Sequence, residues 1–226
     1  MLTSRRGFIE CGAAAGAVAA ITASPAFATV TSPTPAPRTP APRSPAPRTP
    51  ARVVVDPVID NRLLARARAA FERHRGRLSH TDLVGIADFS RPSAVPRFYL
   101  LDTTTGRVTS HLVSHGRGSD PAHSGWLHRF SNAVGSNASS DGAYRTGGFY
   151  YGRYGRSMRL SGLDPSNSNA EARAIVVHSA WYAEPHVVAA HGRLGRSEGC
   201  FAMSYSSLQE TLARLGPGRF LYADKI

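Results

Sequence analysis

The sequence predicts a mainly β domain with a few short helices, preceded by an export signal and a proline-rich linker. Three observations carry this prediction. A twin-arginine motif with a short apolar run opens the chain, a five-residue proline repeat follows, and from residue 83 short β-type runs alternate with glycine-rich turns. The chain has 226 residues in all, so the part beyond the linker has room for one domain of ordinary size.

Residues 1–28 read as a twin-arginine signal peptide. Ser4-Arg5-Arg6-Gly7-Phe8 is followed by an alanine-rich run and then by Ala26-Phe27-Ala28, a small-residue cleavage site. The apolar run has roughly 13 residues, well short of the ~20 that a membrane-spanning helix needs. We therefore expect export by the twin-arginine route to the periplasm or cell wall. Removal of the segment takes Cys11 with it and leaves no transmembrane segment.

Residues 29–52 form a linker rich in proline and arginine. The unit Thr-Pro-Ala-Pro-Arg and its Ser-Pro-Ala-Pro-Arg variant repeat through it, and proline at nearly every second position favours an extended polyproline-II spacer. Its arginines are Arg38, Arg43, Arg48 and Arg52. They predict weak contact with anionic envelope polymers, or else a plain solvated spacer.

Composition excludes several functions. Lys225 is the single lysine and the penultimate residue, which excludes Walker-A nucleotide binding, Ser-x-x-Lys acyl enzymes and Schiff-base chemistry. Two cysteines are too few for a disulfide framework. The formal charge of +12 suits an anionic partner, but an exported chain with scattered arginines argues against nucleic acid. We expect no cofactor and no metal.

After the linker, residues 53–82 form an N-terminal helical segment and residues 83–226 the main domain. Helical apolar spacing with caps or breakers predicts helices over 60–75 and 205–215. Alternating or continuous apolar runs predict strands over 83–89, 97–102, 107–114, 174–178 and 219–223. The Gly-, Ser- and Asn-rich stretch 116–157 predicts functional loops with short strands, and its aromatic residues suit either a ligand groove or the core.

The most informative segment is 191–200, His-Gly-Arg-Leu-Gly-Arg-Ser-Glu-Gly-Cys. Its glycines let backbone N–H groups approach a small target closely, as an oxyanion hole requires. Arg193 and Arg196 would favour the thiolate of Cys200 if they approach it. His178 ends a β-branched run, and a cysteine with a histidine on a separate element is the minimum for an activated nucleophile. The alternative is that Cys200 is a buried small hydrophobic residue.

His178 followed by Arg196-Ser197-Glu198-Gly199-Cys200 resembles the signature of L,D-transpeptidases of the YkuD type. The fuller run is similar to the murein L,D-transpeptidase catalytic domain family. The likeness covers roughly residues 83–224 through these further runs: Tyr99-Leu100-Leu101-Asp102, Phe130-Ser131-Asn132, Gly135-Ser136, Thr146-Gly147, Arg159-Leu160-Ser161-Gly162-Leu163 and Arg173-Ala174-Ile175-Val176-Val177. The resemblance implies an L,D-transpeptidase-like β-sandwich or barrel.

The resemblance also implies a cysteine acyl transferase acting on peptidoglycan stem peptides. Cys200 matches the nucleophile, His178 its base, and Ser179 the residue whose carbonyl orients the imidazole. Gly199 and Cys200 would supply oxyanion donors. Ser197, Arg196 and His191 are the expected substrate-binding residues, with Ser197 also shaping the turn. D-Ala would leave a tetrapeptide donor, and an amine from a second stem would resolve the thioester to a 3→3 crosslink.

Two departures and three alternatives accompany this interpretation. Glu198 and Ala202 stand where the wider family often has histidine and a polar residue, so acceptor choice or rate could differ. Water in place of the amine would give an L,D-carboxypeptidase or endopeptidase. A non-catalytic envelope-binding module needs only the basic linker and the aromatic loop. His186 and His191, with His178 and Cys200, also have a spacing that zinc sites allow.

Overall fold

The computed structural model describes residues 59–226. The expected signal peptide, the proline-rich linker and residues 53–58 of the helical segment lie outside the described residues.

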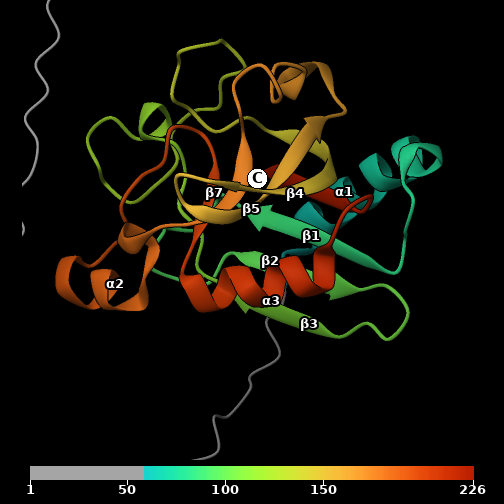
Figure 1. The fold of residues 1–226 in the computed structure, drawn as a ribbon, viewed down its shortest axis with the longest axis horizontal. Coiled ribbons are helices and arrows are strands. Elements are labelled where there is room, and N and C mark those ends of the chain that lie inside the picture. The colour runs from blue at the N-terminus through green and yellow to red at the C-terminus, as the bar shows by residue number, and fades with distance from the viewer. Residues whose placement is uncertain (1–58) are drawn as a thin grey trace, which may run out of the picture. The chain divides into compact units, whose positions relative to one another are not determined.

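Across these residues eight strands form one mixed sheet in the order β3-β2-β1-β8-β4-β5-β6-β7 (Figure 1). Their bounds are β1 Leu83–Asp88, β2 Phe98–Asp102, β3 Val108–His111, β4 Gly142–Gly152, β5 Gly155–Gly162, β6 Val176–Ser179, β7 Phe201–Met203 and β8 Phe220–Asp224. The pairs β1–β8 and β6–β7 are parallel and the other pairs antiparallel. The mainly β class is confirmed.

The two edge strands of the sheet meet through the segment that follows β3. Ser114 forms an isolated antiparallel bridge with Ala202 of β7, and Gly116 forms a parallel bridge with Ser197. The Ser114 amide donates to the Ala202 carbonyl at 2.8 Å. These contacts therefore join the two edges of the sheet locally, at β7, the strand that begins directly after Cys200.

Three α-helices accompany the sheet within the described range: α1 Asn61–His74, α2 Pro185–His191 and α3 Tyr205–Leu215. One buried cluster joins α3 to side chains of seven of the strands, from Leu83 to Ala223. A second joins α1 to Val84 and Ile86, the alternate residues of β1. Because successive strand residues point to opposite faces, α1 and α3 cover opposite faces of the sheet.

Most predicted elements are present. Asp60 caps α1 by accepting from the Arg62 amide, and Ser204 caps α3 by accepting from the Ser207 amide, which is why local sequence found both helices. The expected hairpin is β2–β3. The strand expected at 174–178 begins instead at Val176, because Ala174 has a left-handed backbone with φ of 51°.

The region 116–157 contains more regular structure than expected. β4 is an eleven-residue strand that pairs with β5 in a long hairpin. Some of the glycines that suggested loops lie inside this hairpin: Gly147 and Gly148 at a register shift between Thr146 and Phe149, and Gly152 and Gly155 at its turn. A bulge leaves residues unpaired without ending a strand, so Gly147 and Gly148 interrupt the sequence pattern but not the sheet. Helix α2, with Pro185 in its first turn, was not predicted.

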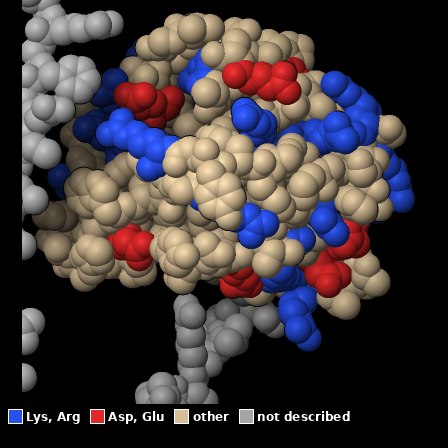
Figure 2. Space-filling view, viewed as in Figure 1, with Lys and Arg blue, Asp and Glu red and all other residues tan. Residues whose placement is uncertain are grey.

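Basic side chains outnumber acidic ones but form no continuous surface on the face seen in Figure 2, where several separate groups of each sign alternate. Within residues 59–226 no helix is long and apolar enough to cross a membrane.

Candidate active site

Strands β6 and β7 bring the histidine and the cysteine onto neighbouring elements. They pair in parallel with His178 opposite Ala202 and Val177 opposite Phe201, and Cys200 immediately precedes β7. Adjacent strands lie about 4.8 Å apart. The nucleophile expected from the sequence therefore sits beside the strand that carries its expected base, although 22 residues separate them along the chain.

The imidazole of His178 is held in one orientation. Its Nδ1 lies 2.9 Å from the Ser179 carbonyl oxygen, which can only accept, so Nδ1 carries a proton and donates. The ring of Tyr154 stacks on it with centroids 4.3 Å apart and an interplanar angle of 23°. Burial lowers the pKa of His178, and the hydrogen bond to Ser179 opposes that shift only in part. The ring is therefore neutral at pH 7, with a lone pair on Nε2 free to take a proton.

The thiol of Cys200 is also neutral in this state. Its Sγ lies 3.6 Å from the carbonyl oxygen of Ala174, to which it donates. Burial raises the pKa of Cys200, Glu198 raises it further, and the Val176 amide and Arg173 act in the opposite direction. A neutral thiol must lose its proton before or during nucleophilic attack, so thiol chemistry at Cys200 would need a base.

The turn before Cys200 is closed by Ser197. Its hydroxyl donates to the Cys200 carbonyl at 2.7 Å and accepts from the Gly199 amide at 3.2 Å. Gly199 has a φ of 114°, and a Cβ there would lie 2.6 Å from the Ala138 carbonyl oxygen. Glycine is therefore required on two counts, backbone conformation and space. The Gly199 amide reaches a substrate oxygen only if its bond to Ser197 opens.

The segment 115–121 braces this turn from outside. The Ser197 amide donates to the His115 carbonyl at 2.9 Å, and the Arg117 amide donates to the Ser197 carbonyl at 2.8 Å. The Arg196 guanidinium donates to the carbonyls of Asp120 and Pro121. The turn that presents Cys200 is thus held by backbone contacts to a segment some 80 residues earlier.

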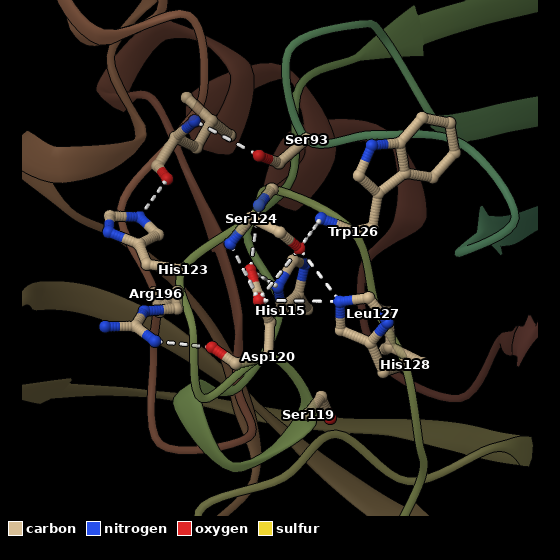
Figure 3. Close-up of polar contacts among 12 residues, drawn as sticks. Ser93, His115, Ser119, Asp120, His123, Ser124, Trp126, Leu127, His128 and Arg196 are labelled. Atoms are coloured by element: carbon tan, nitrogen blue, oxygen red, sulfur yellow. Dashed lines mark hydrogen bonds and ion pairs between the residues drawn. The ribbon is translucent and has the colours of Figure 1, made fainter.

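A buried polar hub underlies that brace (Figure 3). The Asp120 carboxylate accepts from the amides of Ser124 and Gly125 at 2.8 Å each and lies 3.3 Å from His115 Nε2. The other ring nitrogen, Nδ1, lies 2.7 Å from Nη2 of the fully buried Arg97. Because a guanidinium only donates, Nδ1 must accept and Nε2 must donate to Asp120.

The charges of the hub follow from these contacts. Burial and then the Arg97 charge lower the pKa of His115 to about 3, although Asp120 opposes the shift. Burial alone would raise the pKa of Asp120, but hydrogen bonds from Ser124, Gly125 and His115 outweigh it and bring the value to about 2. His115 is therefore a neutral link between a cation and a carboxylate.

The two departures from the family pattern have structural counterparts. Glu198 is exposed and its carboxylate lies 3.0 Å from Nη2 of Arg117, so an arginine offsets part of its charge beside the thiol. Ala202 is fully buried with Ala180, Ala183 and Leu194. A small side chain at Ala202 therefore serves packing beside His178.

A model of the L,D-transpeptidase catalytic domain matches residues 56–223, which is most of the chain and all of the geometry described above. The chain belongs to the L,D-transpeptidase catalytic domain family. The match includes α1 as well as the sheet, so the helical segment lies inside the region that the family shares.

Several solved structures are similar to this L,D-transpeptidase family member at low sequence identity. An L,D-transpeptidase from Mycobacterium smegmatis is 14% identical with a TM-score of 0.39, covering 63% of this chain and 58% of that one. L,D-transpeptidase 3 from Mycobacterium tuberculosis is 16% identical with a TM-score of 0.37, covering 63% and 61%. An L,D-transpeptidase from Xylanimonas cellulosilytica is 15% identical with a TM-score of 0.33, covering 70% and 68%. The chain thus spans less than two thirds of the length of the two mycobacterial proteins. A search of curated proteins finds no match.

The remaining residues expected at the L,D-transpeptidase site lie in different environments. Ser197 is buried at 3% exposure and Arg196 is tethered to 120–121, so both have structural contacts. His191 is an exposed residue at the end of α2. Contact of these three residues with substrate stays a prediction. Within residues 59–226 no three His, Cys, Asp or Glu side chains are placed together to hold a metal ion.

Sequence reasoning missed two side chains that act on the predicted pair, Tyr154 and Arg173. Tyr154 was only one of several aromatic residues expected in either a ligand groove or the core, and nothing local marks it as the residue stacked on His178. Arg173 acts on the charge of Cys200, whereas Arg193 and Arg196 were expected to do so. Both contacts join segments that are distant in sequence, so only the fold shows them.

Proposed function

We propose that this chain is a cysteine acyl transferase that acts on peptidoglycan stem peptides. It releases D-Ala from a tetrapeptide donor through a Cys200 thioester and forms 3→3 crosslinks. Membership of the L,D-transpeptidase catalytic domain family supports the reaction class. The observation that carries the assignment of residues is the oriented imidazole of His178 beside the strand that follows Cys200.

In the first half-reaction the Cys200 sulfur attacks the carbonyl carbon at the L-centre of the donor's diamino acid. The thiol proton passes to Nε2 of His178. This nitrogen has the free lone pair, because Nδ1 donates to the Ser179 carbonyl. Collapse of the tetrahedral intermediate breaks the amide bond, and imidazolium returns the proton to the leaving amine of D-Ala. The products are a thioester on Cys200, free D-Ala and neutral His178.

In the second half-reaction an amine from another stem attacks the thioester carbonyl. His178 takes a proton from that amine and gives it to the departing sulfur, so the enzyme returns to its neutral starting pair. The new amide bond is the 3→3 crosslink. Water at the same step would give a shortened stem instead, which is the hydrolytic alternative.

The Cys200 amide is the leading donor to the developing oxyanion. Among the contacts of the described residues it has no hydrogen-bond acceptor, whereas the Gly199 amide is engaged by Ser197. The stacked ring of Tyr154 favours the second charge that develops, because an aromatic face attracts the imidazolium that forms on His178. The site thus has a group for each charge that the transition state creates.

Export completes the proposal. The twin-arginine motif and the apolar run that follows support delivery to the periplasm or cell wall, where the stem peptides lie. The arginine-bearing linker would add weak contact with anionic envelope polymers without taking part in the chemistry.

The test is product analysis with purified tetrapeptide muropeptides and the full chain, Cys200→Ala and His178→Gln. We expect D-Ala release and 3→3 dimers from the unmodified chain only. Shortened stems without dimers would replace the transferase with the hydrolase. No change of products with folded protein and a free thiol would favour an envelope-binding module, and unchanged wall binding by Cys200→Ala would then agree with it.

A further inference from the structure

We propose that Arg173 is a positioning residue for the Cys200 thiolate. Its guanidinium is fixed by oxygens of the 131–140 loop, lies against Gly199, and supplies the positive charge that favours the ionised nucleophile. This deepens the proposed function and rests on it in one respect, that Cys200 is the nucleophile.

The guanidinium is anchored without being neutralised. Its Nη1 donates to the Ser131 carbonyl at 2.7 Å and to the Ser140 hydroxyl at 2.6 Å, and its Nη2 donates to the Ala138 carbonyl. All three acceptors are uncharged. In the described part of the chain no carboxylate forms an ion pair with Arg173. The full positive charge therefore remains available to a neighbouring anion.

The anchored group lies next to the nucleophile. A Cβ built on Gly199 would be 3.0 Å from Arg173 Nη2, and Gly199 is bonded directly to Cys200. The chain also leads from Arg173 into Ala174, whose carbonyl receives the thiol at 3.6 Å. Ala174 has a φ of 51°, a left-handed conformation that is unfavourable for a residue with a Cβ. Non-glycine residues in that region concentrate at functional sites, and here the strained carbonyl meets the thiol.

The other arginines near the turn do not act on Cys200. Arg196 donates to the carbonyls of residues 120 and 121, and Arg117 pairs with Glu198. A Cβ built on Gly125 would lie 3.1 Å from the Cβ of Arg193, and the charge of Arg193 does not contribute to the pKa shift of Cys200. Arg173 is thus the cation that the fold brings to Cys200.

The remaining groups around Cys200 define what its ionisation must overcome. Burial raises the pKa of the thiol and Glu198 adds to the shift, while the Val176 amide and Arg173 oppose it. His178 is neutral, and burial raises the pKa of Tyr182 with further contributions from Tyr154 and Cys200, so the nearby phenol adds no charge at neutral pH. Glu198 and Arg173 are therefore the opposed charges in this environment.

The experiment measures the ionisation of Cys200 without peptidoglycan. The full chain carrying Cys11→Ser, so that Cys200 is the single thiol, is alkylated with iodoacetamide from pH 5 to pH 10. Arg173→Met should raise the apparent pKa of Cys200 and slow alkylation at pH 7 at least about threefold, which is less than the roughly tenfold per pKa unit that loss of a close opposite charge can cause. The plateau rate at high pH should stay within about twofold. Arg173→Lys keeps the charge, so the apparent pKa of Cys200 in this variant should lie closer to that of the parent.

Arg129→Met is the matched control, because Arg129 also donates to a backbone carbonyl, that of Gly118, at 3.0 Å but is exposed. It should leave the alkylation profile unchanged. An unchanged apparent pKa in folded Arg173→Met overturns the proposal, as does an equal rise in the methionine and lysine variants, which would exclude charge as the cause.

If Arg173→Met does not fold, Ser140→Ala provides a second arm. This variant removes the Ser140 hydroxyl, which lies 2.6 Å from Arg173 Nη1, and keeps both carbonyl acceptors of the guanidinium. The apparent pKa of Cys200 should therefore rise as in Arg173→Met, but by less. No shift in folded Ser140→Ala then overturns the proposal. Because alkylation needs no substrate, this failure differs from failure of the proposed function, which the muropeptide products report.

Discussion

Protonation of His115 is the step by which acid should loosen the brace behind Cys200. In the folded chain Nδ1 accepts from Arg97, so a proton on it must break that bond and place a second cation beside the guanidinium. The folded pKa is about 3, against about 6.5 for an unfolded histidine. The unfolded chain therefore binds the proton first, and stability is complete above pH 6.5 and is lost as pH falls toward 3.

The linkage relation gives the size of the effect. With these two values, His115 alone should lower the free energy of unfolding by about 2 kcal/mol between pH 8 and pH 5. His115→Gln removes the titration, because an amide can accept from Arg97 and donate to Asp120 without changing charge. Between pH 8 and pH 5 the free energy of unfolding of His115→Gln should therefore fall by about 2 kcal/mol less than that of the unmodified chain.

Urea unfolding at half-unit steps of pH measures the difference directly. His128→Gln is the control, because His128 lies 3.8 Å from the Asp120 carboxylate but keeps 56% of its side chain in solvent. It should leave the pH dependence close to that of the unmodified chain. Parallel curves for His115→Gln and the unmodified chain from pH 8 to pH 5 would refute the reasoning.

Three further outcomes follow from the site. Tyr154→Leu should lower kcat about fivefold with little change in KM, since the stacked ring is worth about 1 kcal/mol to an imidazolium, whereas exposed Tyr151→Leu should have no effect; equal losses in both would contradict this. Glu198→Gln should lower the apparent pKa of Cys200, read by alkylation, and an unchanged value would show that Arg117 already cancels the Glu198 charge. In the pH profile of kcat/KM the acid limb should lie below pH 6.5, because burial lowers the pKa of His178, and a limb above that value would be inconsistent with a buried neutral base.

Local sequence predicted the elements whose reasons are local. Asp60 and Ser204 cap α1 and α3, and the Thr-Thr-Thr-Gly turn joins β2 to β3. The β4–β5 hairpin was not predicted, because Gly147 and Gly148 interrupt the alternation at a bulge that only strand pairing accommodates. Closure of the sheet through Ser114 and Ala202 is likewise a contact between distant segments.

The candidate site likewise has some features that the sequence predicts and others that depend on contacts between distant segments. The order and spacing of His178 and Cys200 predicted the pair, which stays a prediction, and the resemblance supplied the Ser179 carbonyl contact that the structure contains. Arg173 could not be ranked above Arg193 or Arg196, since its anchors lie in the 131–140 loop. Electrostatic neighbours of a nucleophile depend on tertiary packing, and sequence distance says little about them.

The most direct test of the central claim is the intact mass of the full chain, with Cys11→Ser, after brief incubation with tetrapeptide muropeptides and acid quenching. The account predicts an adduct equal to the donor minus D-Ala, absent in Cys200→Ala, strongly reduced in His178→Gln, and released by hydroxylamine as a thioester should be. An adduct that persists in Cys200→Ala, or product formation at an unchanged rate without this cysteine, would contradict it.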